Sequence, residues 1–213
     1  MIQLYSDAKC PFSHRIRIVL NEKEMDFKIN DVNVNTRQDL VHLNPYNETP
    51  VLVDDIDKNN KKRDLILIDT NIIAEYVDER FPHPQMMPIE PAEKARMRMA
   101  MHKLDRELFI HVKFIEENRE GKLKKDIDKA KKMIASILDE ISNMFTANKK
   151  MEYFASVSFS LLDACLLPIL WRLSYYEVEV KKTWGPMMKY AETQFNRKSF
   201  LDSLTATERS MKQ

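Results

Sequence analysis

The sequence predicts an α+β domain with the element order βαβαββα, followed by an all-helical domain. Short apolar runs alternate with amphipathic helical stretches over the first eighty residues, whereas no strand pattern returns after residue 91. Four prolines lie between positions 82 and 91, where the pattern changes. We therefore predict a first domain at residues 1–81, a proline-rich linker at 82–90 and a helical domain at 91–213.

Periodicity defines the elements of the first half. We predict strands at 2–5, 27–34, 51–53 and 65–68, helices at 11–24 and 70–80, and a short helical turn at 39–43. The polar residues 54–64 are predicted to form a hairpin loop. Thr70 begins the last helix of this half, and Pro82 ends its pattern.

Three helical stretches define the second half. The first begins at Pro91 and continues to Val112, and the second spans about 122–145. Ser160 and Asp163 match a capping box in form, at the start of a nearly all-apolar helix. We expect that helix to form the core of its domain, with Cys165 as a packing residue and a kink at Pro168.

Composition excludes several classes of protein. The 34 basic and 33 acidic side chains give a net charge of +1, so we expect no direct specific binding to DNA. Two glycines are too few for a phosphate-binding glycine loop. Two distant cysteines and five scattered histidines predict neither disulfides nor a metal site. Without a signal peptide or a long apolar stretch, we expect a cytoplasmic protein that does not enter membranes.

Pro82, His83 and Pro84 form the most informative short motif. Proline fixes φ and lacks an N–H group, and each residue that precedes a proline is pushed toward an extended conformation. We therefore predict a rigid, exposed turn, which we call the knuckle (Pro82-His83-Pro84). It serves either as a linker between domains or as a docking surface, and both roles are compatible.

Several longer segments resemble a known family. They are residues 13–20, 72–84, 160–163 and 199–205. With the βαβαββα half and the helical half, the chain resembles the glutathione transferase superfamily, in which a thioredoxin-like domain precedes an all-helical one. Within it the chain is most similar to the stringent starvation protein A family. The similarity extends over nearly the whole chain.

This resemblance implies a function and partners. The family consists of RNA polymerase-associated transcription regulators of the starvation and stress response, without transferase activity. The implied protein is a noncatalytic adaptor that binds RNA polymerase holoenzyme through Pro82, His83 and Pro84. The fold also implies a dimer, either a homodimer or a heterodimer with a related subunit, and no cofactor.

The resemblance also places a relic ligand pocket at Cys10, Phe12, Thr49, Pro50, Asp69 and Thr70. In such folds the proline at the Pro50 position is usually cis, and an acidic residue followed by a hydroxyl residue grips a carboxylate. Asp69-Thr70 stands in place of the usual Glu-Ser pair, so it either binds an anion or caps the helix. Asn47-Glu48 and the long 54–64 loop depart from the transferase pattern.

Cys10 carries the alternative function, a glutathione-dependent thiol transferase or reductase. A thiol at a helix N-terminus gains thiolate character. However, Ser13 replaces the second thiol of a redox motif, and we interpret Arg15 and Arg17 as surface charge. A third hypothesis is that the relic pocket or the dimer cleft senses a small anion such as guanosine tetraphosphate.

Overall fold

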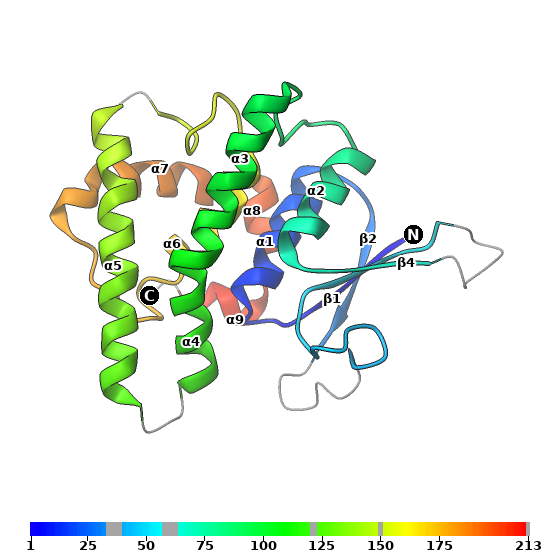
Figure 1. Cartoon of the computed structure of the whole chain (residues 1–213), viewed down its shortest axis with the longest axis horizontal. Helices are drawn as coiled ribbons and strands as arrows, with labels where there is room; N and C mark the ends of the chain where they lie inside the picture. Colours follow the sequence, from blue (N-terminus) through cyan, green and yellow to red (C-terminus); the bar gives the residue numbers. More distant parts are fainter. Residues whose placement is uncertain (33–39, 57–63, 120–122, 149–150, 212–213) are drawn as a thin grey trace. The chain divides into compact units, whose positions relative to one another are not determined.

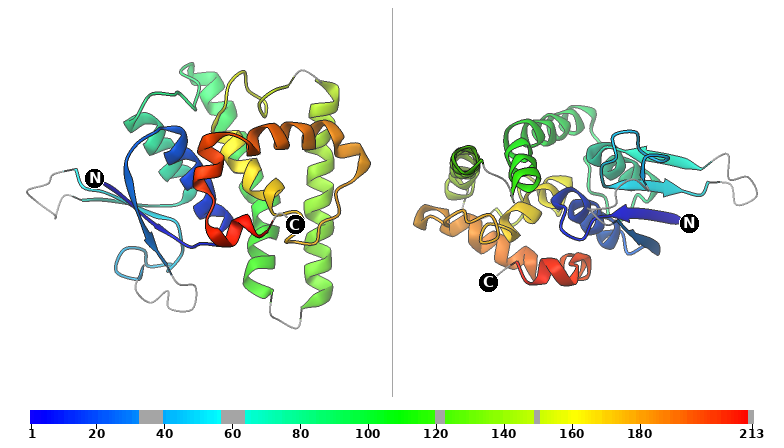
Figure 2. Two further views of the ribbon diagram at one scale, coloured as in Figure 1. Left: turned by 180° about the vertical axis from the view of Figure 1, so that it is seen from behind. Right: turned by 90° about the horizontal axis from the view of Figure 1, so that it is seen from below.

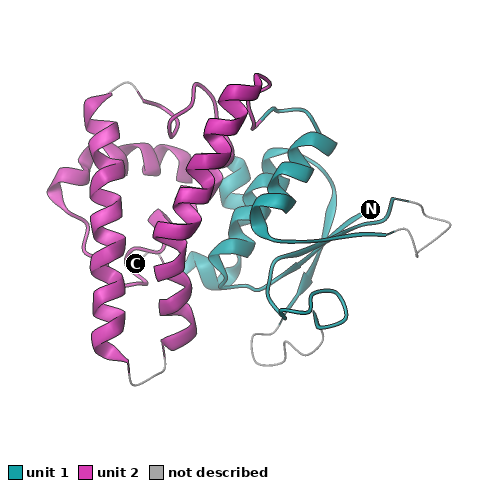
Figure 3. Cartoon of the chain, in the orientation of Figure 1, with its two compact units in different colours: residues 1–85, 197–210 teal, residues 86–196, 211–213 magenta. Residues whose placement is uncertain are grey.

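A computed structural model describes residues 1–32, 40–56, 64–119, 123–148 and 151–211. The chain forms two compact units, which Figure 3 colours separately: residues 1–85 with 197–210, and residues 86–196 with 211–213. The division between Gln85 and Met86 falls inside the predicted 82–90 linker. The predicted 91–213 domain differs at its end, because residues 197–210 belong to the first unit.

The first unit contains a four-stranded mixed sheet. Its elements are β1 (Ile2–Ser6), α1 (Pro11–Glu22), β2 (Phe27–Asp31), β3 (Val51–Asp54), β4 (Leu65–Ile68), α2 (Thr70–Arg80), α8 (Lys198–Ser203) and α9 (Ala206–Arg209). The strand order is β2-β1-β3-β4, with β1 parallel to β2 and the other two pairs antiparallel. Helices α1 and α2 contact each other and cover one face of the sheet (Figures 1 and 2). The predicted thioredoxin-like arrangement is confirmed.

Three local predictions in this unit fall partly outside the described residues. Strand β2 ends at Asp31, and residues 33 and 34 of the predicted strand lie outside the described residues. The predicted turn at 39–43 is described from Leu40, whose carbonyl accepts from the N–H groups of Leu43 and Asn44 at 2.8 and 2.7 Å. Strands β3 and β4 form the predicted hairpin, although residues 57–63 of its loop lie outside the described part.

The second unit is helical in its described residues. Its helices are α3 (Pro91–Leu104), α4 (Ile110–Asn118), α5 (Lys124–Ala147), α6 (Leu161–Trp171) and α7 (Gly185–Phe195), with a 3₁₀ turn at Lys182–Trp184. A π-helical turn, Asp105–Phe109, joins α3 to α4, so the stretch predicted as one helix is continuous but locally widened. Every residue of α6 is buried, including Cys165, which confirms that this helix forms the core.

The capping box at the start of α6 is present and belongs to a larger network. One carboxylate oxygen of Asp163, Oδ2, accepts from the Ser160 N–H at 2.8 Å and from the Ser160 hydroxyl at 3.0 Å. The other oxygen, Oδ1, accepts from the Phe154 N–H at 2.7 Å and from the Tyr190 hydroxyl at 2.6 Å. Asp163 therefore joins the start of α6 to the preceding loop and to α7.

The interpretation of Arg15 and Arg17 as surface charges was wrong. Both residues are buried, with exposures of 0% and 1%. The Arg17 guanidinium donates to both carboxylate oxygens of Glu208 at 2.6 Å and to the Ser203 carbonyl at 2.8 Å. Glu208 and Ser203 lie almost two hundred residues further along the chain, so no local sequence pattern predicts these two partners. This ion pair holds the segment 197–210 in the first unit, where α8 packs against α1.

No helix in the described part of the chain is long and apolar enough to cross a membrane.

Candidate functional site

Cys10 and Thr49 meet where β1 leads into α1. Cys10 is the N-cap residue of α1, and Pro11 occupies the first helical position, where a missing N–H costs nothing. The Cys10 Sγ lies 3.9 Å from the Thr49 carbonyl oxygen, and the Thr49-Pro50 peptide bond is cis, as the resemblance implied. The structure therefore brings Cys10, Thr49 and Pro50 together at one end of α1.

The pKa of Cys10 is shifted in the direction opposite to the thiolate character that the sequence predicted. Burial raises the pKa of the Cys10 thiol above its ordinary value, and the nearby Asp7 carboxylate adds to this. Hydrogen bonds from Ser13 and Thr49 lower the pKa but do not reverse the shift. The thiol is therefore held in its protonated, weakly nucleophilic form at neutral pH.

We expect Cys10 to be alkylated slowly at neutral pH and faster as the pH rises. Because the thiolate is the nucleophile, a raised pKa moves the midpoint of the rate profile to a pH above that of an unperturbed thiol. Iodoacetamide labelling with peptide mapping separates Cys10 from the buried Cys165, and glutathione in the same buffers serves as the reference thiol. A midpoint below about pH 8 would contradict this prediction.

The other half of the relic pocket is the capped start of α2. The Asp69 carboxylate accepts from the N–H groups of Asn71 and Ile72 at 2.9 and 3.2 Å, so Asp69 is the N-cap of α2 and Thr70 its first residue. Asp69 has a φ of 77°, a region that non-glycine residues seldom adopt. The buried Arg15 donates to the Asn71 side chain. Two of the amides that an anion would use at this helix end are already bonded to Asp69.

The knuckle lies directly after α2 and is exposed at Pro82, His83 and Pro84. The Phe81 N–H donates to the Val77 carbonyl at 3.0 Å and closes α2, while the Arg80 guanidinium lies 5.4 Å from the centre of the Phe81 ring. The His83-Pro84 peptide bond is cis. The knuckle is thus an exposed turn directly after a well-formed helix end.

Tyr76 of α2 is half-buried. Its hydroxyl donates to the Asp54 carboxylate at 2.6 Å, and burial together with Asp54 raises the pKa of Tyr76 to about 12. Arg80 reaches the same carboxylate at 3.6 Å. Tyr76 and Arg80 therefore fix α2 against the end of β3.

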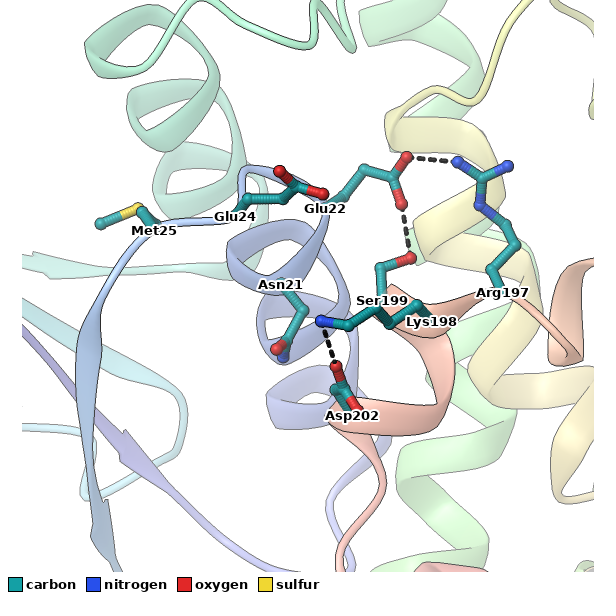
Figure 4. A pocket seen from close by; sticks show the side chains of 8 residues that line it. All are labelled: Asn21, Glu22, Glu24, Met25, Arg197, Lys198, Ser199 and Asp202. Atoms are coloured by element: carbon teal, nitrogen blue, oxygen red, sulfur yellow. Dashed lines mark hydrogen bonds and ion pairs between the residues drawn. The ribbon is translucent and has the colours of Figure 1, made fainter.

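A polar hollow of about 600 Å³, which sequence reasoning missed, lies between the end of α1 and the start of α8 (Figure 4). Glu22 accepts from Arg197 and Ser199, and Lys198 pairs with Asp202 at 3.0 Å. Its lining carries three carboxylates, of Glu22, Glu24 and Asp202, and two cations, of Arg197 and Lys198, so the hollow has a formal excess of one negative charge and does not suit an anionic ligand. Within the described residues, no group of three or more His, Cys, Asp or Glu side chains is placed to hold a metal ion.

Comparisons with known proteins identify the family. The family model "Glutathione S-transferase, N-terminal domain" matches residues 9–80. The Stringent starvation protein A homolog of Haemophilus ducreyi is 34% identical over 96% of this chain and 90% of its own length. The homolog of Coxiella burnetii is also 34% identical, over 100% of this chain and 96% of its own. The chain belongs to the stringent starvation protein A family.

The stringent starvation protein A family assignment agrees with the more distant similarities. Glutathione S-transferase omega-2 of Rattus norvegicus is 28% identical over 89% of this chain and 72% of its own length. A glutathione transferase homolog from Lodderomyces elongisporus has a TM-score of 0.82 at 19% identity, over 95% of this chain and 96% of that one. A Tau class enzyme from mango has a TM-score of 0.79 at 21% identity, over 98% and 94%. These two structures show that the chain has the glutathione transferase fold.

Proposed function

We propose that this protein is a noncatalytic adaptor that binds RNA polymerase holoenzyme and regulates transcription in the starvation and stress response. Family membership supports the biological setting. The observation that carries the residue-level proposal is the exposed knuckle at the end of α2. An adaptor of polymerase acts in the cytoplasm and needs no direct specific contact with DNA.

The knuckle is suited to docking because it loses little freedom on binding. Two prolines restrict the backbone on either side of His83, so we expect the knuckle to lose little conformational freedom on docking. The half-buried Phe81 and the Arg80 above its ring supply an apolar and cationic shoulder beside it. A polymerase surface that accepts this shape would bind a turn that is already formed.

Replacing Pro82, His83 and Pro84 together by alanine should abolish association with RNA polymerase while leaving the fold intact. The three side chains are exposed, so their removal takes away contact surface without opening the core. Polymerase pull-down, circular dichroism and light scattering are measured beside the parent. The matched control is Pro45→Ala/Tyr46→Ala, which removes an exposed proline and an exposed ring elsewhere in the first unit. A folded triple variant that binds polymerase as tightly as the parent would reduce the knuckle to a linker.

We also propose that the protein works as a dimer and that its partners include a small anion such as guanosine tetraphosphate. Light scattering of the isolated chain distinguishes self-association from a need for a related subunit. Because Asp69 caps α2, we assign the anion to the dimer cleft and not to that helix end. The anion is tested by titrating guanosine tetraphosphate in a calorimeter into this chain alone and into this chain with a related subunit. If neither titration releases or absorbs heat, the anion is not a partner.

The alternative is a glutathione-dependent thiol transferase or reductase that uses Cys10. The contact between Cys10 and the Thr49 carbonyl beside the cis proline favours it, and the raised pKa of Cys10 opposes it. Thiol exchange with a glutathione mixed disulfide decides between the two functions. Turnover that disappears in Cys10→Ser would establish an enzyme activity.

A further inference from the structure

Lys23 is a buried lysine just past the end of α1. Its side chain is 0% exposed, although ammonium groups are rarely buried without partners. The Nζ donates to the Asp78 carboxylate of α2 at 2.6 Å and to the Pro84 carbonyl oxygen at 2.5 Å. One cation therefore joins the ends of two helices to the knuckle.

The chemistry of the knuckle explains the use of a side chain for this purpose. Pro82 and Pro84 have no N–H groups, so the turn has few backbone donors with which to hold itself against α2. A lysine ammonium carries three N–H donors and can bond a carboxylate and a carbonyl at once. A cation at the C-terminal end of α1 is also favoured by the helix dipole.

The positive charge of Lys23 is neutralised by Asp78 within the buried ion pair. Asp78 is itself buried, with 6% of its side chain exposed, so the ion pair is sheltered from solvent screening. The second attachment of this helix end is on its other side, where Arg80 and Tyr76 reach Asp54. Of these contacts at the end of α2, the Lys23–Asp78 pair is the one that continues into the knuckle.

We propose that Lys23 is a positioning residue that sets the conformation of the knuckle by binding the Pro84 carbonyl to Asp78. Its effect on polymerase binding rests on the proposed docking function, whereas its effect on the knuckle does not. Lys23 itself would not contact the polymerase, because its side chain is fully buried.

The test replaces the pair by apolar residues in Lys23→Met/Asp78→Leu. Removing one partner alone would leave a buried unpaired charge, whereas replacing both preserves folding in many buried pairs. The control is Lys28→Met, the same substitution at an exposed lysine of β2. We expect the backbone order parameter of His83, measured by ¹⁵N relaxation, to fall from about 0.85 to below about 0.6 in the double variant only. Polymerase affinity should fall about tenfold, which corresponds to ~1.4 kcal/mol.

The outcomes separate the two proposals. An ordered His83 in the folded double variant overturns the positioning role. A mobile His83 with unchanged polymerase affinity supports that role and removes the docking function. The Lys23–Pro84 contact can also be tested in the parent protein. We expect the Lys23 ammonium protons to exchange slowly with water and to show an NOE to Pro84. Exchange as fast as that of Lys28 would also overturn the inference.

Discussion

Replacing Glu208 with glutamine is expected to lower the free energy of unfolding by about 3–5 kcal/mol, because it leaves the buried Arg17 without its counter-charge. Glutamine keeps the size of the side chain, so the loss reports the ion pair and not a cavity. His14, whose Nδ1 lies 3.8 Å from Glu208, belongs to the same buried cluster. A domain stabilised by 5–15 kcal/mol loses a large part of its stability in this way.

The method must report the unfolding of the first unit, which contains Arg17 and Glu208. Both tryptophans, Trp171 and Trp184, lie in the second unit, so urea unfolding is followed by far-ultraviolet circular dichroism and by hydrogen exchange in α1. Asp202→Asn, at an exposed ion pair of the same C-terminal segment, is the matched control and should leave the midpoint unchanged. Arg17→Met/Glu208→Leu should recover only part of the loss, because it removes both charges but also the bonds to the Ser203 carbonyl and the Thr205 N–H. A Glu208→Gln protein as stable as the parent would show that the pair does not form.

Replacing Asp163 with asparagine is expected to lower the free energy of unfolding by about 2–6 kcal/mol. Each carboxylate oxygen accepts two hydrogen bonds, and the amide turns one of these acceptors into a donor. Two buried donors then lose their acceptor, at about 1–3 kcal/mol each. The unit most affected is the second, whose core helix α6 begins at this network.

Tryptophan fluorescence is the appropriate probe for this second loss, since Trp171 is the last residue of α6. Ser160→Ala provides the graded comparison, because loss of the capping residue alone costs about 0.5–2 kcal/mol. Equal effects of the two substitutions would mean that Asp163 acts only as part of the cap and that its bonds to Phe154 and Tyr190 contribute nothing.

The sequence predicted those elements whose signal is local. The 70–80 helix and the Ser160–Asp163 capping box were predicted correctly because period, capping residue and stop signal lie within a few positions of one another. The exposure of Pro82, His83 and Pro84 followed in the same way from the backbone restrictions of proline. The fold of the first unit then followed from element order and resemblance.

What the sequence could not predict depends on partners that are distant along the chain. Arg17 resembles a surface charge until Glu208 is placed beside it, and Lys23 resembles one until Asp78 and Pro84 are in place. The pKa direction at Cys10 was missed for a related reason. A helix N-terminus is visible in sequence, whereas burial, which outweighs it here, is not.

The membership of residues 197–210 in the first unit sets an order of events during synthesis. Arg17 is made 191 residues before Glu208, an interval on the order of 10–40 s at 5–20 residues per second. Throughout that interval the nascent first unit lacks the acceptor for its buried guanidinium, so it is completed only when the last residues of the unit are translated. A ribosome that stops after the helical unit therefore leaves the unit made first as the one that is unfinished.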